Sequence, residues 1–111
     1  VRQSACFLRI STEGECMERV YISGPITGIK DYKRNFAQAV ELLFNKGYQT
    51  INPAGMEIKD GTWEQYMRAD LSLMLQCDSV YMLQGWKKSK GATIEHDLAV
   101  TLGMKVSGAK E

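Results

Sequence analysis

The sequence predicts a small α/β domain. We expect a doubly wound parallel sheet, flavodoxin-like or Rossmann-like, of about four strands in the order 2-1-3-4 with helices on both faces. One pattern in the sequence favours this class. Short runs rich in β-branched and aromatic residues alternate with longer segments of helical periodicity. Such an alternation implies right-handed crossovers between parallel strands, and therefore a sheet that is covered on both faces.

The first strand is expected at residues 19–23, where the run Arg-Val-Tyr-Ile-Ser is rich in strand-forming side chains. A turn-rich loop from Gly24 to Gly28 leads to a helix from about Tyr32 to Lys46, which Gly47 ends. Further strands are expected at residues 48–51, 79–83 and 104–106, and further helices at residues 63–76 and from Ser89 to near Gly103.

These elements form one expected domain at residues 17–111, preceded by a tail at residues 1–16. The tail has no sustained periodicity and mixed charge, whereas Met17 opens directly onto the first strand. We therefore expect the tail to be disordered or loosely attached.

Composition excludes several functional classes. The chain is 44% hydrophobic and 24% charged, with a formal charge of +1, so it has no electrostatic footprint for a nucleic acid polymer. No run approaches the roughly 20 apolar residues of a membrane span, and no signal peptide is evident, so we expect a cytoplasmic protein. Cys6, Cys16 and Cys77 form no CxxC pair and His96 is the only histidine, so we expect neither a disulfide scaffold nor a metal or cofactor. Cys77 is expected to be a small core residue.

Glu95 is the candidate nucleophile. It follows Gly91 by four residues and precedes Ala99 by four, which places it on the buried face of a helix that Ser89 is suited to cap. A carboxylate there needs partners, and we expect the helix N-terminus to help keep it ionised. The alternative is that Glu95 lies at the edge of this face and pairs with Lys88 or Lys90 in water.

Asp70 is a second acid on an apolar helix face, four residues after Tyr66 and four before Met74. Two inward acids suggest chemistry at an anomeric carbon, where one attacks and the other manages the proton of the leaving group. We expect burial to raise the pKa of Asp70, and the two environments to push the two pKa values apart.

Parallel strands gather the loops after their carboxyl ends at one edge of the sheet, where ligands of this fold class bind. This placement gives the candidate substrate contacts, which are Ser23, Gly24, Ile26, Gly28, Asn52, Trp86, Ser89 and Gly91. For Asn52 a turn role competes with a ligand contact, and for Trp86 a sheet-edge role competes with stacking on a base. Trp63 is expected in the core, and His96 is expected to point away from Glu95.

The chain carries three short motifs in order, which are Tyr-Ile-Ser-Gly-Pro-Ile-Thr-Gly at residues 21–28, Asp-Leu at 70–71 and Ser-Lys-Gly-Ala-Thr-Ile-Glu at 89–95. Together they resemble the nucleoside 2-deoxyribosyltransferase superfamily. The resemblance covers residues 19–106 and is closest to a small uncharacterised bacterial and phage branch. It extends more distantly to the deoxynucleoside 5′-monophosphate N-glycosidases. It implies that Glu95 attacks C1′ of deoxyribose, that Asp70 handles the proton of the base, and that Tyr21 steers Glu95 through a hydrogen bond.

The chain departs from that pattern in two ways. Pro25 and Thr27 stand where the glycosidases carry a phosphate-holding serine and arginine, although Ser89 and several lysines remain, so a substrate phosphate is left open. The chain also stops soon after the last strand, where larger members lend residues to a neighbouring subunit. We expect a homodimer with the site near its interface.

Other functions are weighed against this one. A non-catalytic nucleoside- or nucleotide-binding regulatory module on the same fold is the main alternative. A flavodoxin with bound FMN would rest only on the loop after the first strand and on Trp86. A phosphorylated receiver domain is a poor fit, because such a domain needs an acceptor aspartate and the first and third strands of this chain run into Ser23 and Gln84. Gly24 and Gly28 lack the Lys-Ser or Lys-Thr of a P-loop.

Overall fold

The computed structural model describes residues 18–111, and the expected tail at residues 1–16 lies outside them. Four strands are present: β1 (Arg19–Ser23), β2 (Gln49–Ile51), β3 (Ser79–Met82) and β4 (Lys105–Gly108). Three α-helices connect them: α1 (Tyr32–Asn45), α2 (Trp63–Met74) and α3 (Lys90–Thr101). Two short 3-10 helices, η2 (Pro53–Gly55) and η3 (Trp86–Lys88), lie in loops that the sequence pattern did not resolve.

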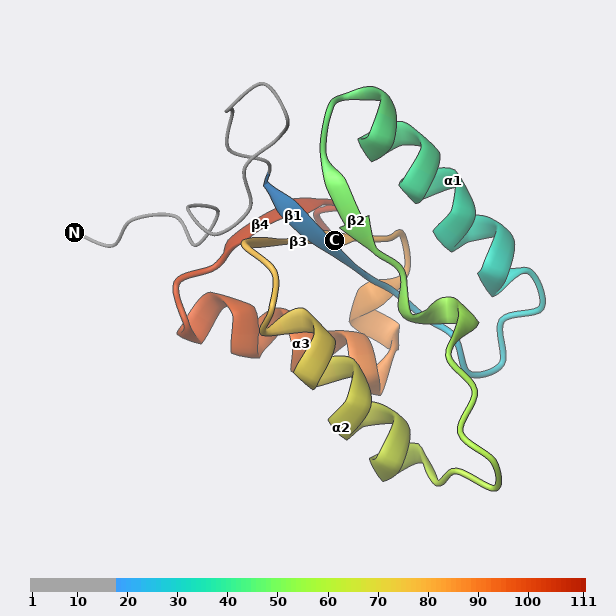
Figure 1. Cartoon of the computed structure of the whole chain (residues 1–111). Coiled ribbons are helices and arrows are strands. Elements are labelled where there is room, and N and C mark those ends of the chain that lie inside the picture. The colour runs from blue at the N-terminus through green and yellow to red at the C-terminus, as the bar shows by residue number, and fades with distance from the viewer. Residues whose placement is uncertain (1–17) are drawn as a thin grey trace.

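The sheet is parallel throughout and has the order β2-β1-β3-β4, which confirms the predicted topology. α1 covers one face of the sheet, whereas α2 and α3 cover the other (Figure 1). Two apolar clusters fill the space between these layers. Val20 and Ile22 pack with Phe36 and Leu43 of α1, whereas Tyr21 packs with Met74 and the α3 side.

Alternation along β1 explains this division. Successive side chains of a strand point to opposite faces, so Val20 and Ile22 face α1 while Tyr21 and Ser23 face the α2 and α3 layer. The two hydroxyl groups of β1 therefore point toward the helix that carries Glu95.

β4 extends to Gly108, two residues beyond the expected strand end at Val106. Ser107 and Gly108 have the composition of a turn, which is why the pattern ended early. Gly108 has a φ of +96°, and a Cβ at this position would overlap the Met82 carbonyl oxygen of the neighbouring strand. The close approach of the two backbones therefore requires glycine.

Within the described residues, no helix has the length and apolar character that crossing a bilayer demands.

Candidate functional site

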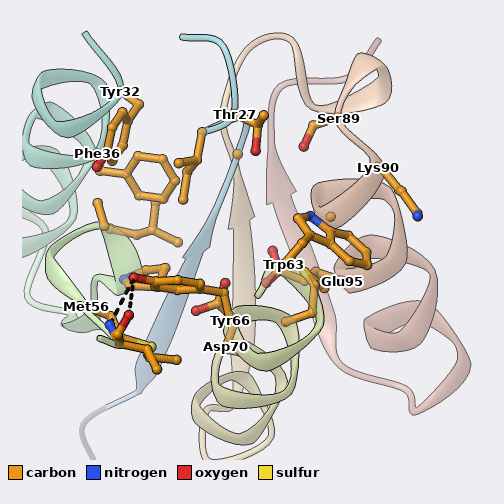
Figure 2. A pocket seen from close by; sticks show the side chains of 18 of the residues that line it. Thr27, Tyr32, Phe36, Met56, Trp63, Tyr66, Asp70, Ser89, Lys90 and Glu95 are labelled. Atoms are coloured by element: carbon orange, nitrogen blue, oxygen red, sulfur yellow. Dashed lines mark hydrogen bonds between the residues drawn. The ribbon is translucent and has the colours of Figure 1, made fainter. Parts of the chain in front are cut away.

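A cleft of about 1310 Å³ opens at the carboxyl end of the sheet. Its walls come from the loop after β1, the segment after β2, the first turns of α2 and the loop that leads into α3 (Figure 2). This is the edge at which open α/β sheets bind ligands. Tyr21, Asp70 and Glu95 all line it, so the structure brings the three predicted catalytic residues into one cavity.

Glu95 is buried, with 4% of its surface exposed. Ser89 caps α3 by accepting a hydrogen bond from the Ala92 N–H at 3.2 Å, which fixes the start of the helix and sets Glu95 on its inward face. The alternative that Glu95 lies at the edge of this face and pairs with Lys88 or Lys90 in water is therefore wrong.

Both oxygens of the Glu95 carboxyl group are held by hydroxyl groups of β1. The Tyr21 hydroxyl donates to Oε2 at 2.7 Å, and the Ser23 hydroxyl donates to Oε1 at 2.6 Å. These distances are typical of short hydrogen bonds to a charged oxygen. The contact with Tyr21 is the one that the resemblance implied.

Burial raises the pKa of Glu95 to about 7, against the lowering effect of the bonds from Ser23 and then Tyr21, and the nearby charge of Asp70 raises it further. Loss of solvent therefore outweighs the favourable contacts, and Glu95 is less readily ionised than the helix N-terminus alone led us to expect. Burial, followed by the charge of Glu95, also raises the pKa of Tyr21, so its hydroxyl stays protonated and remains a donor.

Asp70 lies on α2, whose start is fixed by a capping box between Thr62 and Gln65. Burial raises the pKa of Asp70 to about 6, as predicted. The expectation that the two pKa values would be pushed apart is wrong, because both acids lose solvent and Glu95, the more deeply buried of the two, is raised higher.

Aromatic side chains form much of the cleft wall, and the sequence reasoning missed this role for them. Trp63 is 37% exposed and lines the cleft instead of lying in the core, because it stands at the first position of α2. The Lys90 ammonium group lies 4.3 Å from the centroid of its ring, a cation–π distance. Tyr32, Phe36 and Tyr66 also line the cleft (Figure 2).

Tyr66 is fixed by the loop that precedes α2. Its hydroxyl accepts a hydrogen bond from the Ile58 N–H at 2.9 Å and is 3.3 Å from the Ile58 carbonyl oxygen, to which it donates. The ring therefore presents a largely apolar surface to the cavity. Trp63, Tyr66 and Asp70 recur at helical spacing, and this shared face of α2 is the signal in the sequence that points to the aromatic wall.

Four of the predicted substrate contacts, Gly24, Ile26, Ser89 and Gly91, line the cleft. Gly91 packs closely on α2, because a Cβ there would lie 3.0 Å from the Met67 sulfur and the Met67 side chain would have to shift slightly. Ser23 does not line the cavity and instead lies behind Glu95. Thr27, in the same loop as Gly24, lines it and was not predicted.

Gly28, Asn52 and Trp86 lie outside this cleft, so their assignment as substrate contacts is not supported. Asn52 caps η2, its Oδ1 accepting from the Ala54 N–H at 2.9 Å.

Trp86 is buried, donates from Nε1 to the Ala109 carbonyl at 2.9 Å, and stacks on His96 at a centroid distance of 4.1 Å. Gly28 adopts a φ of +79°, a turn role for which glycine is suited.

Cys77 is buried in the core cluster that contains Tyr21 and Met74, as predicted. Across residues 18–111 there is no group of three or more His, Cys, Asp or Glu side chains arranged to hold a metal ion.

Comparison with curated proteins finds no match. Residues 18–108, most of the chain and all four strands, match the model of a domain of unknown function, DUF4406, and the chain therefore belongs to that family.

Proposed function

We propose that this protein cleaves the bond between base and sugar of a 2-deoxynucleoside or its 5′-monophosphate, as an N-deoxyribosyltransferase or N-glycosidase. The observation that carries the proposal is Glu95, a buried carboxyl group at the wall of a large cleft, held through both oxygens by hydroxyl donors. A buried acid held in this way is unfavourable for folding and is suited to chemistry. The resemblance of residues 19–106 to nucleoside 2-deoxyribosyltransferases supports the same reaction class.

The reaction has two displacement steps. In the first, an oxygen of Glu95 bonds to C1′ while the bond from C1′ to the base nitrogen breaks, and Asp70 gives its proton to the departing base. In the second, a water molecule or another base attacks C1′, the ester bond to Glu95 breaks, and Asp70 recovers a proton from the attacking group. Because positive charge develops on the sugar in both transition states, an adjacent carboxylate stabilises them.

The cleft suits a substrate with a flat apolar part and a polar part. The rings of Tyr66 and Phe36 line one portion, whereas Lys88, Ser89 and Lys90 line the entrance to α3. Aromatic walls with a few polar groups are typical of small-molecule sites. The lysines suit a phosphate group on the substrate, which argues for testing nucleotides beside nucleosides.

The mechanism needs an ionised Glu95 and a protonated Asp70. Burial raises the pKa of Glu95 to about 7 and that of Asp70 to about 6, and the charge of Asp70 raises the pKa of Glu95 further, so the two acids titrate as a coupled pair. A sugar that develops positive charge beside Glu95 favours the ionised form of Glu95.

The test is incubation of the purified protein with a panel of 2-deoxynucleosides, their monophosphates and free bases. Liquid chromatography then separates released bases and exchanged nucleosides. Glu95→Gln should abolish turnover, whereas Glu41→Gln, which alters an exposed acid of α1 outside the cleft, should leave it within a few-fold of the parent. Absence of turnover with every member of the panel would overturn the proposal.

A binding module without catalysis is the second candidate, and the raised pKa of Glu95 favours it, because a neutral carboxyl group is a poor nucleophile. Calorimetry separates the two. A module binds deoxynucleosides without cleaving them, and Glu95→Gln leaves its affinity unchanged.

A further inference from the structure

Ser23, the last residue of β1, contacts Glu95 without lining the cleft. Ser23 and Tyr21 are both buried, at 1% and 0% exposed, but Tyr21 and Glu95 contribute to the cleft lining and Ser23 does not. The Ser23 hydroxyl donates to Oε1 of Glu95 at 2.6 Å. Any effect of Ser23 on a molecule in the cleft is therefore expected to pass through Glu95.

The backbone around Ser23 leaves its hydroxyl little freedom. Ser23 pairs with Met82 of β3, and its carbonyl oxygen accepts a hydrogen bond from the Leu83 N–H at 2.8 Å. The next residue, Gly24, packs so closely that a Cβ there would lie 2.7 Å from the Leu83 Cβ. A donor on such a fixed strand end is already oriented before the reaction begins.

On the basis of the proposed function, we propose that Ser23 is a positioning residue that holds Oε1 of Glu95 through both displacement steps and leaves Oε2 as the attacking atom. Oε2 is the oxygen bonded to Tyr21, which lies at the cleft wall. In the first step the Oε2–C1′ bond forms as the bond to the base breaks, and Oε1 becomes the carbonyl oxygen of the ester. In the second step the Oε2–C1′ bond breaks and its electron pair returns to the carboxylate.

This assignment gives Ser23 a different effect on each step. A hydroxyl group donates a stronger hydrogen bond to a carboxylate than to an ester carbonyl. Its bond to Oε1 therefore strengthens as the ester breaks, which favours the second step. The same bond is the largest of the effects that lower the pKa of Glu95, ahead of that from Tyr21, so it also increases the fraction of nucleophile ready for the first step.

The chain offers a matched control for Ser23→Ala. Ser79 is a buried strand serine at 3% exposure on the neighbouring strand β3, and it makes no hydrogen bond to Glu95. Infrared titration of the ligand-free protein measures the pKa of Glu95 directly, with Glu95→Gln identifying the carboxyl band. Ser23→Ala should raise that pKa by about one unit or more, whereas Ser79→Ala should leave it unchanged.

Two further variants keep the titration decisive if Ser23→Ala folds poorly. Ser23→Thr retains a hydroxyl group and should keep the pKa of Glu95 near that of the parent protein. Ser23→Cys has a weaker donor and should raise it. An unchanged pKa in both Ser23→Ala and Ser23→Cys would overturn the assignment of Ser23, whatever the outcome of the turnover assay.

Rapid quenching and intact-mass measurement test the second step. With a deoxynucleoside that the parent turns over, the adduct is first allowed to form and the protein is then freed of substrate, so that only breakdown of the ester is followed. The adduct should decay at least several-fold more slowly in Ser23→Ala than in Ser79→Ala, because the second step loses the bond that strengthens as the ester breaks. An equal or faster decay would contradict the role in the second step. If the parent turns over nothing, the proposed function fails while the titration still decides whether Ser23 controls Glu95.

Discussion

Replacement of Glu95 by glutamine should stabilise the fold at alkaline pH, and this prediction separates a buried functional acid from a structural one. Glu95 is 4% exposed, and burial raises its pKa from 4.5 to about 7. The folded protein therefore binds more protons at Glu95 than the unfolded chain does between these two values. The stability that this residue contributes is fully present below pH 4.5 and is lost as pH rises through 7.

The size of the effect follows from the shift. A difference of about 2.5 pKa units corresponds to about 3 kcal/mol of unfolding free energy, which the ionised carboxylate costs the folded state above pH 8. Glutamine has nearly the same shape and no charge. Glu95→Gln should accordingly be more stable than the parent by up to about 3 kcal/mol at pH 8.5, and nearly equal to it at pH 5.

Urea unfolding of the two proteins at both pH values measures this difference, and linear extrapolation gives each free energy. Glu41→Gln, an exposed acid on α1, serves as the control and should show a difference within about 0.5 kcal/mol at either pH. If Glu95→Gln is less stable than the parent at pH 8.5, the carboxylate is a stabilising partner in the core and the reasoning from its burial is refuted.

Four other outcomes are expected. Turnover should follow a bell-shaped pH profile with its maximum between pH 6 and 7. The reaction needs Glu95, with a pKa of about 7, to be ionised and Asp70, with a pKa of about 6, to be protonated. A rate that rises steadily to pH 9 would contradict this. Asp70→Asn should lower kcat by about 10²-fold or more with little change in affinity, and least for the bases that leave most easily, as steady-state kinetics on a series of bases will show. Trp63→Ala should weaken binding of deoxynucleosides to Glu95→Gln by about 1 kcal/mol, measured by calorimetry, since the indole lines the cleft and is 37% exposed. Trp86→Phe should leave turnover within a few-fold of the parent, because Trp86 lies outside the cleft, and should lower the thermal midpoint of unfolding, because the hydrogen bond to the Ala109 carbonyl is lost. A large loss of turnover would show that Trp86 contributes to the site.

The fold was predictable because local and global signals agree in this chain. Short strands with β-branched residues, helices with one apolar face and a glycine at the end of the first helix all favour the same parallel sheet, and its order is the one observed. The catalytic candidates were predictable for a related reason. Glu95 and Asp70 are acids at positions where helical periodicity favours apolar residues. Each departs from the pattern, and this departure identifies it as a candidate functional residue.

The remaining parts of the site depend on three-dimensional facts that spacing does not carry. Trp63 follows the apolar period of α2, yet it stands at the N-terminal end of the helix, where it lines the cleft. Trp86 follows a strand end, but η3 turns its ring toward His96 and away from the cleft. The protonation of Glu95 depended on a balance between desolvation and two hydroxyl donors, and only the burial of its side chain decides that balance.

The central claim is that Glu95 bonds to the sugar, and peptide mapping of an acid-quenched reaction tests it most directly. After incubation with a deoxynucleoside that releases its base, the peptide that contains Glu95 should gain the mass of one deoxyribosyl group, and fragmentation should assign that group to the Glu95 side chain. Base release with no such adduct under rapid quenching, or an adduct on Asp70 in its place, would contradict the account.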